Sequence, residues 1–435
     1  MDGVNRSAVA LSLAALVLLA CKDDTTKGTP TGTSAGTPSG TGGGGAGPAC
    51  PESGVLHGPW AMRFDETSIR VRWDACAPSS TEIVVEPEGG GEPVTFQGEQ
   101  AAADVQTSYD VINGVPPDLP GIRYRTEVAV NGLQAGSCYR YQLAADSGRR
   151  GRFCTAKAAG APFKFFAVGD TNPSVGDTTG VLDHMPSDVD FTIHLGDIQY
   201  YASVFESWAT WFPDMQPLLR QGAFQPSIGN HEYEIDFEFQ DYYERLFGGA
   251  GFDSPVVEWY RFQSGGVWFF SLSTEADLDA GTDQANWLEA QLADAASQPG
   301  YRFGVVYFHK PMMTLSEYTQ KKGERLHFDP IFRQHGVRLV MCGHVHGYER
   351  FVDGELTYIV SGGGGAALHD LDVTADERPE EASKRVASSS TYHGTVIEVL
   401  ADSIHGTAIG HDGRTLDDFT IDLSSGGAGG SGGGS

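Results

Sequence analysis

The sequence predicts a multidomain protein in which an N-terminal β-sandwich precedes an α/β domain whose β-sheets are flanked by helices. Three observations predict this fold class. Short runs that alternate apolar and polar residues fill residues 54–157, and apolar runs that end abruptly in polar clusters begin at Phe163. Amphipathic stretches separate some of the later runs. The chain has 435 residues, which is enough for two or three domains.

Residues 1–20 are typical of an export signal. The apolar stretch AVALSLAALVLLA at residues 8–20 follows Arg6 and is too short to span a bilayer comfortably. Leu18-Leu19-Ala20 directly precedes Cys21 and resembles a bacterial lipobox, which implies cleavage before Cys21 and its lipidation. An ordinary signal peptide with a chance cysteine is the alternative. We therefore expect an exported bacterial lipoprotein, periplasmic or on the cell surface, attached to the membrane by its lipid only.

Two terminal segments lack the apolar residues that a folded core needs. Residues 22–49 consist mostly of Thr, Gly, Ser, Pro and Ala, so residues 21–53 are predicted to be the lipidated cysteine and a disordered tether. Residues 424–435 form a Gly/Ser-rich tail, which is either native or an added linker.

The net charge argues against nucleic-acid binding. The formal charge is −28, from 57 acidic and 29 basic residues, and such a field repels polyanions. It also repels phosphate esters at long range, so a phosphate site here needs strong local positive charge, which bound metal ions could supply. The charge does not indicate an oligomeric state.

Export favours disulfide bonds. Cys138 and Cys154 lie in two strand-like runs separated by the turn residues Asp146-Ser147-Gly148, so a hairpin would bring them together. Cys50 with Cys76 is the remaining candidate pair. Cys342 lies in an apolar run, and we expect a buried free thiol.

Residues 54–157 are predicted to form the sandwich. The runs SIRVRWDA, TEIVVEP, RYRTEVAV and CYRYQLA alternate in polarity, with turn-forming residues between them. The pattern resembles that of a fibronectin type III domain in five residues: Trp73, Leu133, Gly136, Tyr139 and Tyr141.

Residues 158–423 are predicted to form the α/β domain. Its apolar runs are FKFFAVGD (163–170), DFTIHLGD (190–197), FQPSIGNHE (224–232), VWFFSLST (267–274), FGVVYFHK (303–310) and VRLVMCGHVH (337–346). Residues 282–297 place Trp287, Leu288 and Leu292 on one helical face. Strands that alternate with helices favour sheets buried between helices.

Metal-binding residue types follow these runs, where α/β proteins bind their ligands. They are Asp170, Asp197, Asn230, His231, His309, His344 and His346. Singly, each has an ordinary structural explanation, such as a capping turn or a core histidine. His344 and His346 alternate, so on a strand both would face the same side. Carboxylate, amide and imidazole groups together suit Fe, Zn or Mn.

The order Asp170, Gly196-Asp197, Gly229-Asn230-His231-Glu232, His309 and Gly343-His344-Val345-His346 resembles the calcineurin-like metallophosphoesterase superfamily. Tyr200, three residues after Asp197, narrows the resemblance to the purple acid phosphatases. The preceding sandwich narrows it further, to the plant-type members of that family. A Tyr that merely packs near the site is the alternative for Tyr200. This resemblance implies that Asp170, Tyr200 and His346 bind Fe(III). It implies that Asn230, His309 and His344 bind a divalent ion (Zn, Fe or Mn), and that Asp197 bridges the two.

The resemblance also implies a reaction. Two cations about 3.5–4 Å apart hold the phosphate and a hydroxide, which attacks phosphorus in line with the departing ester oxygen. His231 would contact the phosphate and protonate the leaving group.

Two features depart from the family pattern. Asn172 stands where a second Gly is usual; Asn tolerates a left-handed backbone, and Asn172 could reach substrate. Plant-type members carry a further His about ten residues after the equivalent of His309, but PMMTLSEYTQKK at 311–322 has none. Lys321, Lys322 or His327 is a candidate substitute. The glycine run at 362–365 either approaches the site or forms a flexible turn.

The sequence therefore predicts a phosphatase for small-molecule phosphate monoesters. A phosphodiesterase or nucleotide hydrolase on the same metals is one alternative, because the loops that form the pocket walls decide access. A surface binding protein with a vestigial metal domain is another. Trp208, Trp211 and Tyr233 are candidates for stacking on a leaving group or for core packing.

Overall fold

The computed structural model describes residues 50–105, 121–173, 175–200, 208–233, 239–249, 251, 254 and 256–424. The predicted signal peptide, Cys21, residues 22–49 of the tether and residues 425–435 of the tail lie outside the described residues. Within the part of the chain that is described, no helix combines the length and apolarity needed to cross a bilayer.

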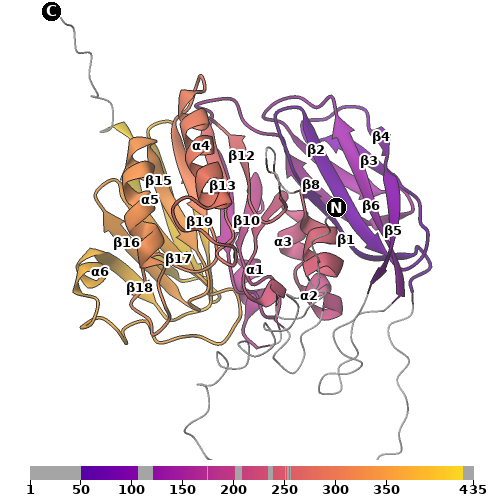
Figure 1. Cartoon of the computed structure of the whole chain (residues 1–435). Helices are drawn as coiled ribbons and strands as arrows, with labels where there is room; N and C mark the ends of the chain where they lie inside the picture. Colours follow the sequence, from indigo (N-terminus) through magenta and orange to yellow (C-terminus); the bar gives the residue numbers. More distant parts are fainter. Residues whose placement is uncertain are drawn as a thin grey trace, which may run out of the picture. The chain divides into compact units, whose positions relative to one another are not determined.

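The N-terminal region is built from antiparallel strands in two layers (Figure 1). One layer pairs β1 (Val55–Met62), β2 (Ser68–Ala75), β6 (Gly121–Asn131) and β5 (Glu99–Val105) in that order. The other, called here the N-terminal sheet, pairs β4 (Val94–Gln97), β3 (Glu82–Pro87), β7 (Cys138–Leu143) and β8 (Asp146–Cys154). Trp73, Val85 and Phe153 are buried because alternate residues of each strand face inward. The predicted antiparallel β-region is confirmed.

Both predicted disulfides are present. Cys138 and Cys154 are direct cross-strand partners on β7 and β8, and their sulfur atoms are bonded. Cys50 is bonded to Cys76. Cys342 is a buried free thiol, as expected.

All six apolar runs form strands. β9 (Phe163–Val168), β10 (Phe191–Leu195) and β11 (Ala223–Ser227) are parallel neighbours, and β19 (His393–Val399), β20 (Ser403–Gly410) and β21 (Thr415–Asp422) extend the sheet beyond β9. A second sheet, called here the helix-covered sheet, pairs β12 (Tyr260–Ser264), β13 (Val267–Ser271), β14 (Phe303–Tyr307), β15 (Val337–Cys342), β17 (Leu356–Ser361), β16 (Tyr348–Asp353) and β18 (Arg385–Ser389).

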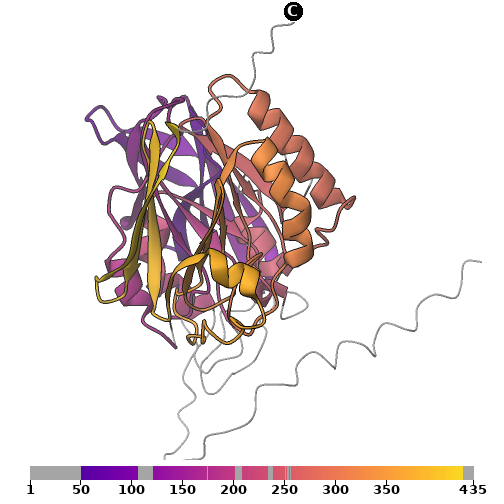
Figure 2. The same cartoon turned by 90° about the vertical axis from the view of Figure 1, so that its left-hand side faces the viewer.

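Aromatic side chains fill the space between these two sheets. Phe191 lies 5.2 Å from Phe269 and Phe262 lies 4.7 Å from Phe269, measured between ring centroids. On its other face the helix-covered sheet packs against α4 (Asp283–Ser297) and α5 (Lys322–Gln334), which lie side by side in Figures 1 and 2. α4 begins where Thr282 accepts a hydrogen bond from the Ala285 amide, a typical N-cap. The α/β architecture is confirmed.

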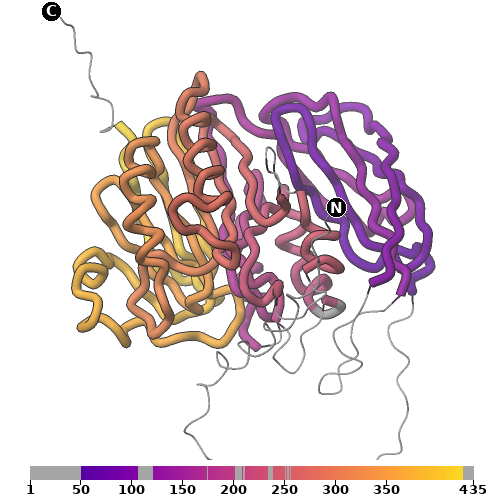
Figure 3. Tube along the Cα trace, in the orientation of Figure 1, coloured from indigo at the N-terminus to yellow at the C-terminus, as the bar shows by residue number. Residues whose placement is uncertain are grey.

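One sheet runs through both regions, which the sequence does not predict. β1 pairs in parallel with β11 at Ala61 and Ala223, although 162 positions separate them in the chain. Figure 3 traces the whole chain in the same orientation as Figure 1, coloured by residue number. Within the described residues the resulting long sheet has ten strands, in the order β21-β20-β19-β9-β10-β11-β1-β2-β6-β5. The π-helix η2 (Phe239–Phe247) contacts the N-terminal part of this long sheet through Arg245, whose guanidinium lies 2.6 Å from buried Asp74 on β2. The remaining short helices are α1 (Thr178–Asp183), α2 (Trp208–Asp214), α3 (Gln216–Arg220), the 3-10 helix η1 (His231–Tyr233) and α6 (Pro379–Lys384).

Candidate metal centre

Polar side chains follow five parallel strands at the edge where those strands end. Strands β9, β10 and β11 pair in parallel, and so do β14 and β15. The carboxyl ends of the strands in each sheet therefore lie at a common edge. The residues that follow these strands are Asp170, Asp197, Asn230, His231, His309, His344 and His346.

Asp170, Tyr200 and His346 form a first cluster. The Tyr200 hydroxyl donates to Asp170 Oδ1 at 3.0 Å and lies 3.1 Å from His346 Nε2, which is itself 3.4 Å from Asp170 Oδ1. His346 Nδ1 lies 2.7 Å from the Ala367 carbonyl oxygen. Because a carbonyl can only accept, Nδ1 carries the proton and Nε2 presents its lone pair to the cluster.

Asp197, His309 and His344 form a second cluster. His309 Nε2 lies 3.0 Å from Asp197 Oδ2 and 3.2 Å from His344 Nδ1. One donor atom from each of the three residues lies within 4.8 Å of the others. His309 Nδ1 donates to the Leu195 carbonyl at 2.9 Å, which leaves Nε2 facing Asp197 and His344.

Backbone bonds connect the two clusters. The His344 amide donates to Asp170 Oδ2 at 2.8 Å. The His231 amide donates to Asp197 Oδ1 at 2.9 Å, and the His231 ring lies 4.1 Å from the Tyr200 ring between centroids. These contacts place the two clusters next to each other and set His231 beside both.

Three of these residues have a left-handed backbone. Asp170, Asp197 and His344 have φ values of 60°, 51° and 68°. Such conformations cost about 1–3 kcal/mol each and persist where the surroundings hold them. Asn172 does not share this conformation, so the expected left-handed turn residue is Asp170 itself. Asn172 is buried and its carbonyl accepts from the Gly176 amide.

The motif glycines leave room for ligand side chains of other loops. A Cβ on Gly229 would lie 2.2 Å from Asp197 Oδ1, and one on Gly343 would lie 2.5 Å from Asp170 Oδ2. The glycine run at 362–365 serves the same purpose, since a Cβ on Gly362 would lie 2.6 Å from Asp170 Oδ2. That run therefore approaches the site, which decides between the two interpretations offered by the sequence.

Electrostatics favour ligand-competent forms of His344 and Asp197. Burial lowers the pKa of His344 to about 2, and the neighbouring charge of His309 lowers it too. Burial raises the pKa of Asp197, but His309 and His231 lower it more, so the carboxyl pKa ends well below its usual range. A neutral imidazole and an ionised carboxylate are the forms that bind metals. Burial lowers the pKa of His309, but Asp197 raises it more, to about 10, so a metal that binds His309 must displace its proton.

Glu232 is a functional residue that the sequence reasoning did not assign. Its buried carboxylate accepts hydrogen bonds from the amides of Asp197 (3.1 Å), Ile198 (2.6 Å) and Gly229 (2.6 Å). Burial and the charge of Asp197 raise its pKa to about 7. Glu232 thus holds together the two loops that carry Asp197 and Asn230. The sequence signal that could have identified Glu232 is its position in the Gly-Asn-His-Glu motif.

His369 and Tyr318 are two further residues that the sequence did not single out. The His369 ring stacks on His346 at 3.9 Å and on Tyr318 at 4.4 Å, and Tyr318 packs edge-on against His344 at 5.2 Å, all between centroids. His369 Nδ1 accepts from the His346 amide at 3.0 Å. Tyr318 comes from the stretch at 311–322 that lacks the family histidine.

The three candidate substitutes for that histidine have other partners. Lys321 pairs with Glu324 at 3.0 Å, Lys322 lies 3.5 Å from Glu381, and His327 lies 3.0 Å from Glu289. The aromatic pair Tyr318–His369 lies beside the metal-binding histidines instead.

One other interpretation is corrected, and one pair of alternatives is decided. β15 ends at Cys342, so His344 and His346 do not alternate on a strand; the turn sends His344 to the second cluster and His346 to the first. Trp208 and Trp211 are core residues, both buried and 5.5 Å apart between centroids. Tyr233 is half exposed and stacks on Phe239 at 5.0 Å.

The residues present fit a pair of metal ions. The buried Asn230 Oδ1 has no hydrogen-bond partner among the described residues. Burying an oxygen without a partner destabilises the fold unless the oxygen binds a cation. Both clusters combine carboxylate oxygen with imidazole nitrogen, the donors that suit Fe, Zn and Mn. The grouping Cys138–Cys154–Asp190 does not fit a metal, because its two sulfur atoms are joined in a disulfide.

The sequence pattern of the calcineurin-like phosphoesterase family matches residues 163–348, the segment that carries every one of these candidate ligands. The chain is a calcineurin-like metallophosphoesterase related to the purple acid phosphatases.

Individual comparisons agree with this relationship. Purple acid phosphatase 18 of Arabidopsis thaliana is 29% identical over 303 residues, which cover 65% of this chain and 63% of that protein. The uncharacterized protein Rv2577 of Mycobacterium tuberculosis is 27% identical over 350 residues, covering 69% of this chain and 62% of that protein. The metallophosphoesterase thus spans a little under two thirds of the length of these relatives.

Solved structures support the fold. Purple acid phosphatase PPD1 from yellow lupin (Lupinus luteus) seeds superposes with a TM-score of 0.67 at 17% identity, over 85% of this chain and 75% of that one. At this identity the likeness shows the fold alone, including the β-region before the α/β sheets.

Proposed function

We propose that this metallophosphoesterase hydrolyses phosphate monoesters at a pair of metal ions held by the two clusters. The observation that carries the proposal is the 2.8 Å hydrogen bond from the His344 amide to Asp170 Oδ2, which joins the two clusters into one site. Family membership supports phosphate-ester chemistry, and the phosphatase named among the relatives supports monoesters as the substrate.

The assignment of ligands follows the clusters. Asp170, Tyr200 and His346 would hold Fe(III), because a carboxylate and a phenol oxygen provide hard donors for a trivalent ion. His309 and His344 would hold the divalent ion (Zn, Fe or Mn), together with the unpaired amide oxygen of Asn230. Asp197 would contact both ions.

When bound, such a pair supplies positive charge to the phosphate oxygens and lowers the pKa of a water molecule. The protein itself holds the ligands rigidly, through the amide bonds of Glu232 and the carbonyl bonds of His309 and His346. Local positive charge is what a chain of net charge −28 needs in order to bind an anionic ester.

His231 is the proposed catalytic residue. Its side chain is 22% exposed whereas Asp197 is buried, and its Nε2 lies 3.7 Å from Asp197 Oδ2. It therefore sits between the carboxylate and the solvent from which the ester arrives. From there it would donate a hydrogen bond to the phosphate or a proton to the departing alkoxide. Asn172, two residues after Asp170, is the second proposed substrate contact.

The proposal includes an extracytoplasmic location with a lipid anchor at Cys21. The two disulfide bonds support export, because disulfides persist in oxidising compartments. Labelling of the full chain with a fatty-acid analogue in cells, compared with Cys21→Ser, tests the anchor. Equal labelling of both chains would exclude it.

The activity is tested by following phosphate release from an aryl phosphate. The purified full chain, loaded with iron and a divalent ion, is assayed with and without a strong chelator, beside Asp197→Asn. We expect the chelator to abolish hydrolysis and the substitution to lower kcat/KM by at least about 100-fold, since it removes the shared carboxylate charge.

Asp402→Asn, at an exposed position outside the site, is the matched control and should keep full activity. Hydrolysis that survives both the chelator and the Asp197 substitution would refute the metal-dependent reaction. Turnover of diesters but not monoesters would move the substrate to the phosphodiesterase alternative.

A further inference from the structure

A hollow lies along β8, the edge strand of the N-terminal sheet. It has a volume of about 820 Å³, within the range of small-molecule sites, and none of the proposed metal ligands lines it. Its wall combines the outer face of the N-terminal sheet with Ser187, Asp188 and the end of α3. The residues that matter below are Glu88, Arg140, Tyr141, Arg150, Arg152 and Arg220.

The pairing of β7 with β8 places three of the arginines on the same face of the N-terminal sheet. Arg140 on β7 is the cross-strand partner of Arg152 on β8, and Arg150 is two residues from Arg152 on the same strand. Side chains two residues apart on a strand share a face, so these three project together. Arg220 comes from the last turn of α3, where Gln216 Oε1 accepts from its Nε at 2.9 Å.

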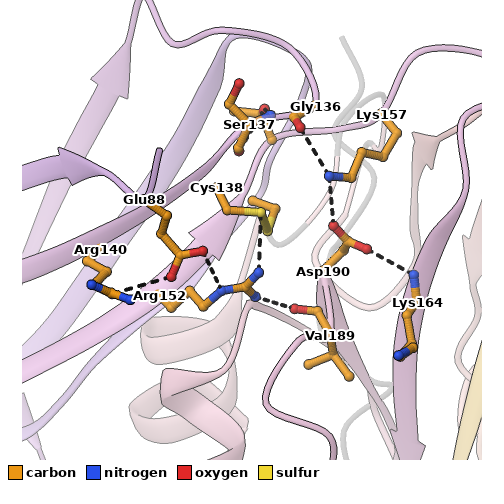
Figure 4. The surroundings of a disulfide bond; sticks show 12 residues. Glu88, Gly136, Ser137, Cys138, Arg140, Arg152, Lys157, Lys164, Val189 and Asp190 are labelled. Carbon is orange, nitrogen blue, oxygen red and sulfur yellow. Dashed lines mark hydrogen bonds and ion pairs between the residues drawn. A yellow bond between two sulfur atoms is a disulfide. The ribbon is translucent and has the colours of Figure 1, made fainter. Parts of the chain in front are cut away.

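Four arginines and three acidic residues, Glu86, Glu88 and Asp188, line the hollow, so its lining has a net positive charge. Glu88 is shared between Arg140 (3.4 Å) and Arg152 (3.2 Å), as Figure 4 shows. Asp188 is engaged by Lys164 at 2.8 Å. Among the described residues, neither Arg150 nor Arg220 has an acidic partner within ion-pair distance. This is unusual in a chain with 57 acidic and 29 basic residues.

A buried hydroxyl adds an independent sign of a ligand. Tyr141 is 2% exposed, and its hydroxyl has no hydrogen-bond partner within the described part of the chain. Tyr141 follows Arg140 on β7, so it projects to the opposite face of the sheet from the three β-strand arginines. Its hydroxyl reaches the hollow at the open edge of the sheet, over Gly151 in β8, where a Cβ would come within 2.5 Å of it. Buried polar groups normally have a hydrogen-bond partner, so the Tyr141 hydroxyl is available to donate to a ligand. Arg220 lies close enough for its charge to affect this hydroxyl.

We propose that this hollow binds a small oxyanion, a phosphate or a carboxylate, between Arg150 and Arg220 with Tyr141 as a further donor. The planar guanidinium group presents paired N–H donors that match two oxygens of a carboxylate or phosphate. Arg152 completes the wall and is held in place by the Val189 carbonyl and by Cys138 Sγ (Figure 4). The site is separate from the metal centre and does not depend on the proposed function.

The test measures anion binding to the metal-loaded full chain by calorimetry. Inorganic phosphate and glucuronate are the two probes, and the chains are the natural protein, Arg150→Gln with Arg220→Gln, Tyr141→Phe, and Arg414→Gln as an exposed arginine control. Phosphate binding at the metal centre is followed separately, as competitive inhibition of aryl phosphate hydrolysis.

Besides any phosphate binding at the metal centre, we expect one further binding event. The double variant should weaken this event at least tenfold, the effect expected when a charge-assisted hydrogen bond is lost. Tyr141→Phe should weaken it less, Arg414→Gln should not change it, and inhibition at the metal centre should stay the same in all four chains. Binding of phosphate alone would identify a free phosphate ion as the ligand, and binding of glucuronate alone a carboxylate-bearing molecule. Failure of both probes to bind outside the metal centre, or equal binding to the double variant, would overturn the proposal.

Discussion

The hydroxyl of Tyr200 donates to Asp170 Oδ1 at 3.0 Å, and the hydroxyl oxygen of Tyr200 lies 3.1 Å from His346 Nε2. Because the Tyr200 proton points to Asp170 and the His346 proton is on Nδ1, the phenol oxygen and Nε2 face each other with no proton between them, and a bound cation would stabilise this contact. Burial and the charge of Asp170 raise the pKa of Tyr200, so only a strong cation would make its phenolate form stable.

A phenolate of Tyr200 bound to Fe(III), as proposed, should give the iron-loaded protein a visible charge-transfer absorption, and replacing Tyr200 with Phe should abolish this band while the fold is kept. The absorption spectrum of the purified chain measures this directly. Tyr233→Phe, at a half-exposed tyrosine outside the first cluster, is the control and should leave the band in place. An unchanged band in Tyr200→Phe would remove the phenol from the ligand set.

His231→Ala should lower kcat by about 10²–10⁴-fold, the range for loss of a general acid. Because the assigned ligands stay in place, the variant should bind the same amount of metal as the natural chain. Paired measurements of kcat and of metal content therefore separate the two roles. Parallel loss of metal would show that His231 holds the site rather than taking part in the reaction.

Glu232→Gln should destabilise the loops that carry Asp197 and Asn230. One carboxylate oxygen becomes an NH₂ group that faces backbone amides, which leaves a buried donor without an acceptor and costs about 1–3 kcal/mol of folding free energy. We also expect metal affinity to fall about 10–100-fold. Urea unfolding and metal titration measure the two effects. Glu66→Gln, at an exposed turn, is the control, and equal values in both variants would contradict the role given to Glu232.

Asp74→Asn should cost about 3–5 kcal/mol of stability, because it leaves Arg123 and Arg245 buried without a full negative charge. Burial raises the pKa of Asp74, but Arg245 and Arg123 lower it further, to below its ordinary value. The stabilisation is therefore complete above about pH 4 and is lost as the pH falls through the lower, folded-state pKa.

Unfolding free energies between pH 3 and pH 6 test this pH dependence. The natural chain should lose stability below about pH 4 more steeply than Asp74→Asn, since the variant has no carboxyl group to protonate there. Asp402→Asn should follow the natural chain. Identical pH profiles for Asp74→Asn and the natural chain would contradict the assignment.

Much of the site could be predicted because its residues sit in strand-end motifs. Apolar runs that stop at Asp170, Asp197 and His309 mark both the strands and the edge where they meet. Both disulfide pairs followed from a hairpin and from elimination, and both are present.

Other features depend on contacts that no local pattern encodes. His369 reaches His346 through a loop with no strand or helix periodicity, so its ring contact is visible only in the folded chain. The pairing of β1 with β11 satisfies the edges of two regions that the sequence presents as separate. The turn after Cys342, which sends His344 and His346 to different clusters, requires a left-handed histidine that sequence alone does not indicate.

Metal content per chain tests the central claim most directly. We expect elemental analysis of the loaded chain to find two metal ions per chain in the natural protein. His346→Ala should lose the iron and keep the divalent ion, whereas His344→Ala should lose the divalent ion and keep the iron, because the two histidines belong to different clusters. A single ion per chain in the natural protein, or the loss of the same ion in both variants, would contradict a site built from two clusters.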